Sequence, residues 1–294
     1  MKKISIIGAG TMGNGIAQVF AMNNYKVDLI DLNSDSLSNA MNTISINLDR
    51  MIKKDIISDD QKLSVLDNLS TSTNIKDAKS SELVIEAVTE NIGIKLKIFQ
   101  QLDQLCPSET ILATNTSSIS ITEIAAATNR EDRVIGMHFM NPVPIMKLVE
   151  VIRGRKTSDQ TTNTIIELSE TIKKIAIEVN DYPGFIANRI LLPMINEAIE
   201  ALHTGVAKVQ NIDSIMKIGM GHPMGPLQLA DFIGLDVCIS ILEVMHEGLK
   251  DIKYAPSELL KNMVNSGKLG VKSGEGFYDY SNSKKAEIVA KQFQ

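Results

Sequence analysis

His138 and Glu150 are the two residues of this sequence best placed to move a proton. His138 lies near the end of the strand-like run RVIGMHF, shortly before an Asn-Pro turn, and Glu150 lies inside the apolar run KLVEVI. A carboxylate in an apolar run is costly to bury unless something pairs with it. If the two runs are strands joined by a turn centred near Pro144, the two side chains face each other. The alternative is a solvated carboxylate on an edge strand.

This pair suits the oxidation of a secondary alcohol. Histidine exchanges protons near neutral pH and is a common general base. A carboxylate bonded to one ring nitrogen fixes the tautomer and stabilises the imidazolium. The hydride that leaves the carbon needs a separate acceptor, such as a nicotinamide cofactor. The remaining histidines, His203, His222 and His246, are interpreted as structural.

A glycine-rich segment, GAGTMG, supplies a site for such a cofactor. It matches G-x-G-x-x-G, follows a short strand-like run and opens a helical pattern, which is the context that a dinucleotide fingerprint requires. The glycines allow a tight turn, close approach of a pyrophosphate and close helix packing. A glycine turn without a ligand is the alternative. The residues assigned to cofactor binding here are Gly8, Gly10, Thr11, Met12 and Gly13.

Asp31 lies at the end of the second strand-like run, KVDLIDL, and completes this pattern. Its carboxylate can accept hydrogen bonds from the adenosine ribose hydroxyls. A carboxylate also repels a 2′-phosphate, and no arginine follows within several residues to reverse that preference. The sequence therefore favours NAD over NADP.

Strand and helix patterns alternate along the first part of the chain, which predicts an α/β fold with a Rossmann-like, mostly parallel sheet. An amphipathic helix over 37–52 and a short helix over 59–67 form a predicted helical hairpin inserted into this sheet domain. The run KLVEVIRG is expected to lie antiparallel to RVIGMHF. The other predicted strands are KISII, KVDLIDL, SELVIEAV, TILATN and IAIEVND, and the other predicted helices cover 12–22 and 160–173.

The pattern changes at DYPGFIANR, where Pro183-Gly184 interrupts the chain. We expect an NAD-binding domain over 1–183 and an all-helical domain over 184–294 for substrate binding and dimerisation. Its helical apolar spacing covers 184–203, 210–219 and 226–247.

Composition narrows the possible functions. The chain has 294 residues, 44% hydrophobic and 22% charged, with a net charge of −5, which fits a globular protein. No basic block suggests nucleic-acid binding, and no apolar window is long enough for a membrane span. Two cysteines, Cys106 and Cys238, are too few for a disulfide framework or a cysteine metal site. We expect a cytoplasmic protein without a metal.

Six motifs together resemble the L-3-hydroxyacyl-CoA dehydrogenase family, and its short, single-function bacterial members fit best in length and layout. They are GAGTMG, ATNTSS, HFMNPVPIMKLVEV, DYPGFIANRI, MGHPMGPLQLADFIGLD and GEGFYDY, and the resemblance extends from residue 1 to about residue 280. It implies NAD-dependent interconversion of (S)-3-hydroxyacyl-CoA and 3-oxoacyl-CoA. Short chains such as 3-hydroxybutyryl-CoA and acetoacetyl-CoA are the expected substrates, and a homodimer or higher homo-oligomer is the expected assembly.

The resemblance also implies roles for residues that the sequence alone would leave as ordinary polar positions. It assigns catalysis to His138 with Glu150, and contacts with the substrate hydroxyl or thioester to Ser117 and Asn188. Lys53 and Lys54 in the inserted hairpin become candidates for binding coenzyme A phosphates, with a solvated helix face as the alternative. The further NAD contacts implied are Asp31, Glu90, Lys95, Asn115 and Asn141, with Lys272 from the other domain.

Two other functions remain open at this point. One is a related sugar-acid dehydrogenase of the gulonate type. The other is a catalytically idle relative with a structural or NAD-sensing role, which the His138–Glu150 pair argues against.

Overall fold

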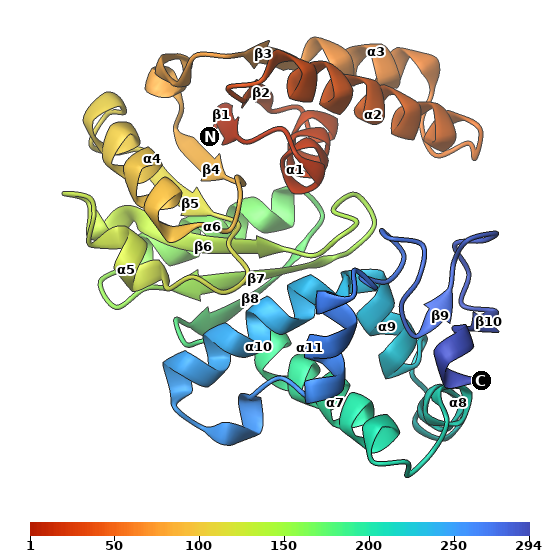
Figure 1. Cartoon of the computed structure of the whole chain (residues 1–294). Coiled ribbons are helices and arrows are strands. Elements are labelled where there is room, and N and C mark those ends of the chain that lie inside the picture. Colours follow the sequence, from red (N-terminus) through yellow and green to blue (C-terminus); the bar gives the residue numbers. More distant parts are fainter. The chain divides into compact units, whose positions relative to one another are not determined.

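The computed structural model describes all 294 residues and divides them into two compact units. Unit 1 comprises Met1–Tyr182 and unit 2 comprises Pro183–Gln294. Each unit has a hydrophobic core of its own. The two are described separately below, and Figure 1 shows the elements of each.

Unit 1 is built on an eight-stranded sheet in the order β3-β2-β1-β4-β5-β6-β7-β8. The first six strands are parallel, β7 runs antiparallel to β6, and β8 is parallel to β7. This confirms the mostly parallel sheet and the antiparallel seventh strand. The strands are β1 (Lys3–Ile7), β2 (Lys26–Ile30), β3 (Leu69–Ser72), β4 (Leu83–Glu86), β5 (Ile111–Thr114), β6 (Val134–Phe139), β7 (Leu148–Arg153) and β8 (Ile175–Asn180).

The central strands are buried along almost their whole length, because a parallel sheet is covered on both faces. Their β-branched runs therefore read as continuously apolar rather than alternating. The strand order reverses direction at β1, whose neighbours are β2 and β4. Ligands bind open α/β sheets at the carboxyl ends of strands beside such a switch point. The helices of this sheet domain are α1 (Thr11–Met22), α4 (Ile92–Leu105), α5 (Ile121–Ala125) and α6 (Asp159–Thr171).

The inserted hairpin consists of α2 (Ser34–Ile52) and α3 (Asp59–Asp67), which lie between β2 and β3 in the chain (Figure 1). Asn33 caps α2 by accepting two backbone N–H groups, and Ser58 forms a capping box with Gln61 at the start of α3. The hairpin is confirmed. The sequence analysis missed β3, an edge strand with the polar sequence LSTS, because it has neither an apolar run nor clear alternation.

Unit 2 is mainly helical, as expected, with two differences. The helix expected over 226–247 is interrupted at Gly234, whose φ of +104° lies outside the helical region. Two helices replace it, α9 (Pro226–Ile233) and α10 (Leu235–Leu249). Two short strands, β9 (Tyr278–Asp279) and β10 (Ile288–Val289), add a small antiparallel pair. The remaining helices are α7 (Ala187–His203), α8 (Val209–Met220) and α11 (Glu258–Asn265). None of the helices combines the length and the apolar character that crossing a lipid bilayer requires.

Candidate active site

The glycine segment forms the tight turn between β1 and α1. Gly8 has a φ of +104°, and its N–H donates to the Ile30 carbonyl at 2.7 Å. A Cβ on Gly13 would lie 1.8 Å from the Gly8 carbonyl oxygen, so only glycine allows α1 to begin this close to the strand. A Cβ on Gly10 would meet no atom within 4 Å. Gly10 therefore faces open space at the N-terminus of α1, which fits the close approach of a pyrophosphate.

A pocket of about 430 Å³ opens beside this turn, at the switch point between β1 and β4. Gly8, Gly10 and Asp31 line it, as the sequence pattern predicts for a dinucleotide site. Its volume and its mainly apolar lining suit the adenosine end of a dinucleotide. The sequence analysis did not single out the other lining residues, although most directly follow strand ends or share one face of α4. They are Ile7, Ile30, Leu32, Ser36, Ile75, Ala87, Val88, Thr89, Ile94, Ile98 and Gln101.

Asp31 also holds the turn itself together. Its Oδ2 accepts the Ala9 N–H at 2.8 Å, and its Oδ1 accepts the Asn33 N–H at 2.9 Å. The carboxylate therefore braces the glycine turn besides facing the pocket. From the sequence, only a contact with the ribose was predicted for Asp31. The bond between Ala9 and Asp31 joins two segments that no periodic pattern in the sequence relates.

His138 and Glu150 are directly opposed in the register of β6 and β7. The His138 Nδ1 and Glu150 Oε2 atoms lie 2.8 Å apart, and both side chains are buried. The predicted pairing is confirmed. The edge-strand reading of Glu150 is wrong, because β7 lies between β6 and β8 in the sheet. The short distance and the burial make this a strong, well-oriented contact.

Asn115 joins the end of β5 to the end of β6 next to this pair. Its Oδ1 accepts the Phe139 N–H at 2.9 Å, and its own backbone N–H donates to the Glu86 carbonyl at 2.8 Å. Asn141 is exposed in the loop that follows β6 and is joined to Pro142 by a cis peptide bond. Thr11 and Met12 occupy the first turn of α1.

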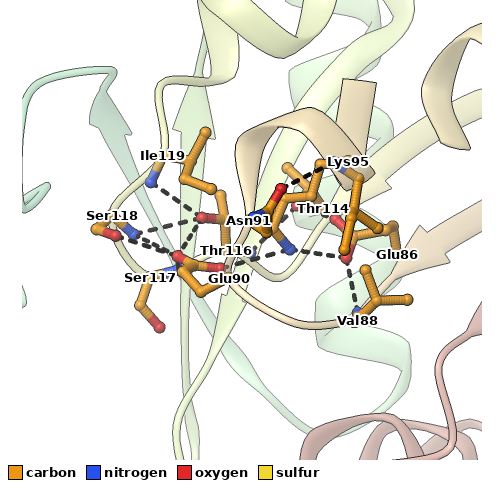
Figure 2. Close-up of polar contacts among 11 residues, drawn as sticks. Glu86, Val88, Glu90, Asn91, Lys95, Thr114, Thr116, Ser117, Ser118 and Ile119 are labelled. Atoms are coloured by element: carbon orange, nitrogen blue, oxygen red, sulfur yellow. Dashed lines mark hydrogen bonds and ion pairs between the residues drawn. The ribbon is translucent and has the colours of Figure 1, made fainter. Parts of the chain in front are cut away.

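Glu90 anchors the turn that carries Ser117 (Figure 2). Its Oε1 accepts the Ser117 N–H at 2.8 Å, the Ser118 N–H at 3.1 Å and the Thr116 hydroxyl at 2.5 Å. Burial alone would raise the pKa of Glu90, but the Lys95 ammonium and these hydrogen bonds hold it below its ordinary value. The carboxylate is therefore kept ionised at the carboxyl end of the sheet.

Lys95 is buried, whereas a lysine that contacts the cofactor directly is expected to be exposed. Its side chain is 1% exposed, and its Nζ lies 2.7 Å from Glu86 Oε1 and 3.4 Å from Glu90 Oε2. The sequence analysis assigned no role to Glu86, because a glutamate that ends an apolar strand has no motif of its own.

The other predicted site residues belong to the end of α2 and to unit 2. Lys53 and Lys54 are exposed at the C-terminal end of α2. Asn188 is buried in the first turn of α7, and the Lys272 ammonium forms an ion pair with Asp236 at the start of α10. Asn188 and Lys272 belong to unit 2.

Comparisons with known proteins agree over both units. Residues 3–182 match the family model described as 3-hydroxyacyl-CoA dehydrogenase, NAD binding domain, and residues 184–280 match 3-hydroxyacyl-CoA dehydrogenase, C-terminal domain. The chain is 53% identical over 280 residues to a probable 3-hydroxybutyryl-CoA dehydrogenase of Bacillus subtilis, a match that covers 95% of this chain and 98% of that protein. The mitochondrial hydroxyacyl-coenzyme A dehydrogenase of Rattus norvegicus is 43% identical, and the match covers 95% of this chain and 91% of that protein.

A solved structure gives the same result. The crystal structure of (S)-3-hydroxybutyryl-CoA dehydrogenase from Ralstonia eutropha superposes with a TM-score of 0.93 at 47% identity, and the match covers 96% of this chain and 100% of that one. The two family models, which together cover most of the chain, and these similar proteins show that the chain belongs to the 3-hydroxyacyl-CoA dehydrogenase family of NAD-dependent oxidoreductases.

Proposed function

We propose that this protein interconverts (S)-3-hydroxybutyryl-CoA and acetoacetyl-CoA with NAD, and that His138 is the general acid and base. The observation that carries the proposal is the buried contact between His138 Nδ1 and Glu150 Oε2 at 2.8 Å. The names of relatives about half identical to this chain support the short-chain acyl-CoA substrate.

The geometry of the pair supports proton transfer at one defined atom. In the proposed mechanism Glu150 accepts the Nδ1–H of His138, which leaves the lone pair on Nε2 to take the proton of the substrate hydroxyl. The Glu150 carboxylate stabilises the imidazolium that results. Bound NAD supplies the hydride acceptor. In the reverse direction the imidazolium returns the proton to the oxygen of the 3-oxo group.

Further polar groups are assigned to the substrate by the same proposal. The Ser117 turn is held by Glu90 at the carboxyl end of the sheet, and we assign its hydroxyl to the substrate oxygen. Asn188 is assigned to the thioester or the hydroxyl from unit 2. Such donors stabilise charge that develops on the oxygen. Lys53 and Lys54, exposed at the end of α2, are assigned to the phosphates of coenzyme A.

Unit 2 also supports self-association. Its helix α8 exposes Ile215, Ile218 and Met220, with Ile218 86% exposed. Apolar side chains gathered on one helix are a common feature of protein interfaces. We therefore propose that the chain forms a homodimer through unit 2. A cytoplasmic location belongs to the same proposal, and the two buried, unpaired cysteines are consistent with it.

The deciding experiment compares substrates. With acetoacetyl-CoA as substrate, NADH should be oxidised rapidly and NADPH more slowly. NADH should not be oxidised with the oxidised form of a gulonate-type sugar acid. Rapid turnover of the sugar-acid substrate would favour the alternative dehydrogenase. NADH binding without turnover of either substrate would favour an idle relative.

A further inference from the structure

A relay of three charges, Glu86, Lys95 and Glu90, connects two turns at the carboxyl end of the sheet (Figure 2), with Glu86 and Lys95 buried and Glu90 partly exposed. One turn, Ala87–Thr89, follows β4 and lines the cofactor pocket. The other, Thr116–Ser118, follows β5 and carries Ser117. Glu86 touches the first turn, Glu90 touches the second, and the Lys95 ammonium lies between the two carboxylates at 2.7 and 3.4 Å.

Glu86 touches the first turn directly and is linked to the second turn through other residues. Its side chain is completely buried. Its Oε1 accepts the Val88 N–H and the Lys95 ammonium, both at 2.7 Å, and its Oε2 accepts the Thr114 hydroxyl at 2.7 Å. The Thr114 hydroxyl oxygen also accepts the Thr116 N–H at 3.2 Å. Glu86 therefore reaches the second turn by two routes, through Lys95 and through Thr114.

A buried ion pair such as Glu86 and Lys95 is weak evidence for stabilisation. Burying two charges has a desolvation cost that their attraction often fails to offset, and well-packed apolar residues of similar size are often as stable. Lys95 also lies in the first turn of α4, where the helix dipole disfavours a cation. The pair is present despite both costs. We therefore look for its role in how the two charges position the residues around them.

We propose that Glu86 is a positioning residue for the reaction. It keeps the Lys95 ammonium from moving onto Glu90, so that Glu90 continues to hold the backbone of Ser117. Glu86 itself touches neither the substrate nor the cofactor. Its importance for turnover rests on the proposed function, whereas its hold on the Ser117 turn does not.

The test is the variant Glu86→Gln. The amide retains the size of the side chain and an acceptor for the Val88 N–H, but it removes the charge that faces Lys95. Amide hydrogen exchange should become faster at Ser117 and Ser118, and kcat with acetoacetyl-CoA should fall about 10–100-fold, because a small misplacement of a contacting group has effects of that size. The affinity for NADH, measured by fluorescence titration, should change less than kcat.

Asp103→Asn provides the matched control. Asp103 pairs with Arg130 at 2.7 Å beside the other end of α4, and both side chains are largely buried. This variant also loses a buried ion pair of unit 1, so it should lower the melting temperature while leaving Ser117 exchange and kcat unchanged. If Glu86→Gln does not fold, Thr114→Val removes one contact of Glu86 without changing any charge, and should produce the same two effects to a smaller extent.

The outcomes separate the two proposals. Unchanged exchange at Ser117 and Ser118 in a folded variant would overturn the inference, and so would faster exchange with wild-type kinetics. Equal losses of kcat in Glu86→Gln and Asp103→Asn would reduce Glu86 to a structural residue. If the wild type did not act on acetoacetyl-CoA, the proposed function would fail, and the exchange comparison alone would decide whether Glu86 positions the Ser117 turn.

Discussion

The Lys174 ammonium donates to the Val143 carbonyl oxygen at 2.5 Å and also to that of Met146 at 2.6 Å. Lys174 is largely buried, and burial lowers its pKa. Both carbonyls belong to the loop between β6 and β7, which joins the strands of His138 and Glu150. Val143 in turn packs against α1, where a Cβ on Gly15 would lie 2.9 Å from the Val143 Cβ. One lysine therefore fixes the loop that connects the His–Glu hairpin to the cofactor helix.

Replacement of Lys174 by Met should destabilise unit 1 and slow the reaction. The methionine retains the apolar stem but leaves the two carbonyls without their donor. An unsatisfied buried group, such as the Val143 carbonyl, costs roughly 1–3 kcal/mol, whereas water can reach the partly exposed Met146 end. The free energy of unfolding from urea titrations should fall by about that amount, and kcat should fall with it.

Lys173→Met is the matched control, because Lys173 is the exposed neighbour of Lys174. It should leave both quantities unchanged. Gly15→Ala should disturb the same loop from the side of α1 and lower kcat as well. Wild-type stability and kcat in Lys174→Met would show that the loop holds its position without the ammonium.

Replacement of Glu150 by Gln should lower kcat by about 10²–10⁴-fold, which is the usual contribution of a positioned acid or base. The amide has nearly the same size, so the melting temperature and NADH binding should change little. It removes the charge that stabilises the imidazolium and presents an N–H where Nδ1 needs an acceptor. Glu178→Gln on the adjacent strand, an exposed partner of Arg153, should retain wild-type kcat. Equal kcat values in the two variants would remove Glu150 from the mechanism.

The His138–Glu150 contact could be predicted from the sequence because a hairpin relates its residues by simple symmetry. Once the turn is centred near Pro144, the antiparallel register follows and brings the two side chains together. The glycine turn is equally local, since strand, glycines and helix occur in one short segment. The same holds for the inserted hairpin, whose two helices have regular apolar spacing and good caps.

The relay around Glu86 could not be predicted in this way. Glu86 and Lys95 are joined only when β4 and α4 pack together, and no period in the sequence relates them. The same limit applies to Lys174, whose partners lie in a loop far earlier in the chain. The break at Gly234 was missed for a different reason, since apolar spacing continues across it and only the backbone angle shows that two helices are present.

Asp31→Ala should reduce the preference for NADH over NADPH, measured as the ratio of the two kcat/KM values. The ratio should fall about 10–100-fold, because hydrogen bonds to a charged group contribute about 1.5–3 kcal/mol. NADH affinity should fall too, since Asp31 also holds the Ala9 N–H of the glycine turn. Asp28→Ala on β2, the strand that Asp31 follows, should leave the ratio unchanged; Asp28 pairs with Lys3. An unchanged ratio in Asp31→Ala would show that another residue selects the cofactor.

The double variant Lys53→Ala/Lys54→Ala should raise KM for acetoacetyl-CoA by about 2–10-fold, the range expected when exposed charge pairs are lost. KM for NADH should not change. The effect should shrink as the salt concentration rises, because exposed charges are screened. It should vanish with acetoacetyl-pantetheine, which lacks the nucleotide phosphates.

Lys284→Ala/Lys285→Ala is the control for this pair, since these two lysines are also adjacent and exposed. It should leave KM for acetoacetyl-CoA at the wild-type value. An equal rise of KM in the two double variants would indicate a general effect of net charge and would return Lys53 and Lys54 to a solvated helix face.

The stability of unit 2 should depend on pH through Asp231. Its carboxylate is almost completely buried and accepts the Phe277 and Tyr278 N–H groups, both at 2.9 Å, and the Tyr280 hydroxyl at 3.1 Å. Burial raises the pKa of Asp231 from 3.8 to about 7; the hydrogen bonds oppose this effect, and the nearby Asp213 charge adds to it. A raised pKa means that folding favours the protonated form. This contribution is complete below pH 3.8 and is lost as the pH rises to about 7.

Thermal unfolding across this pH range checks the prediction when the wild type is compared with Asp231→Asn. The variant should be less stable throughout, because an amide N–H then faces a backbone donor. Its stability should fall less steeply than that of the wild type between pH 3.8 and about pH 7. Tyr280→Phe removes a hydrogen bond that lowers the pKa of Asp231, so the fall in stability should move to higher pH. Asp279→Asn in the same segment should retain the wild-type slope, because hydrogen bonds from Ser281 lower the Asp279 pKa and it titrates below this range. Parallel curves for the wild type and Asp231→Asn would show that Asp231 has the same protonation state in the folded and unfolded chain.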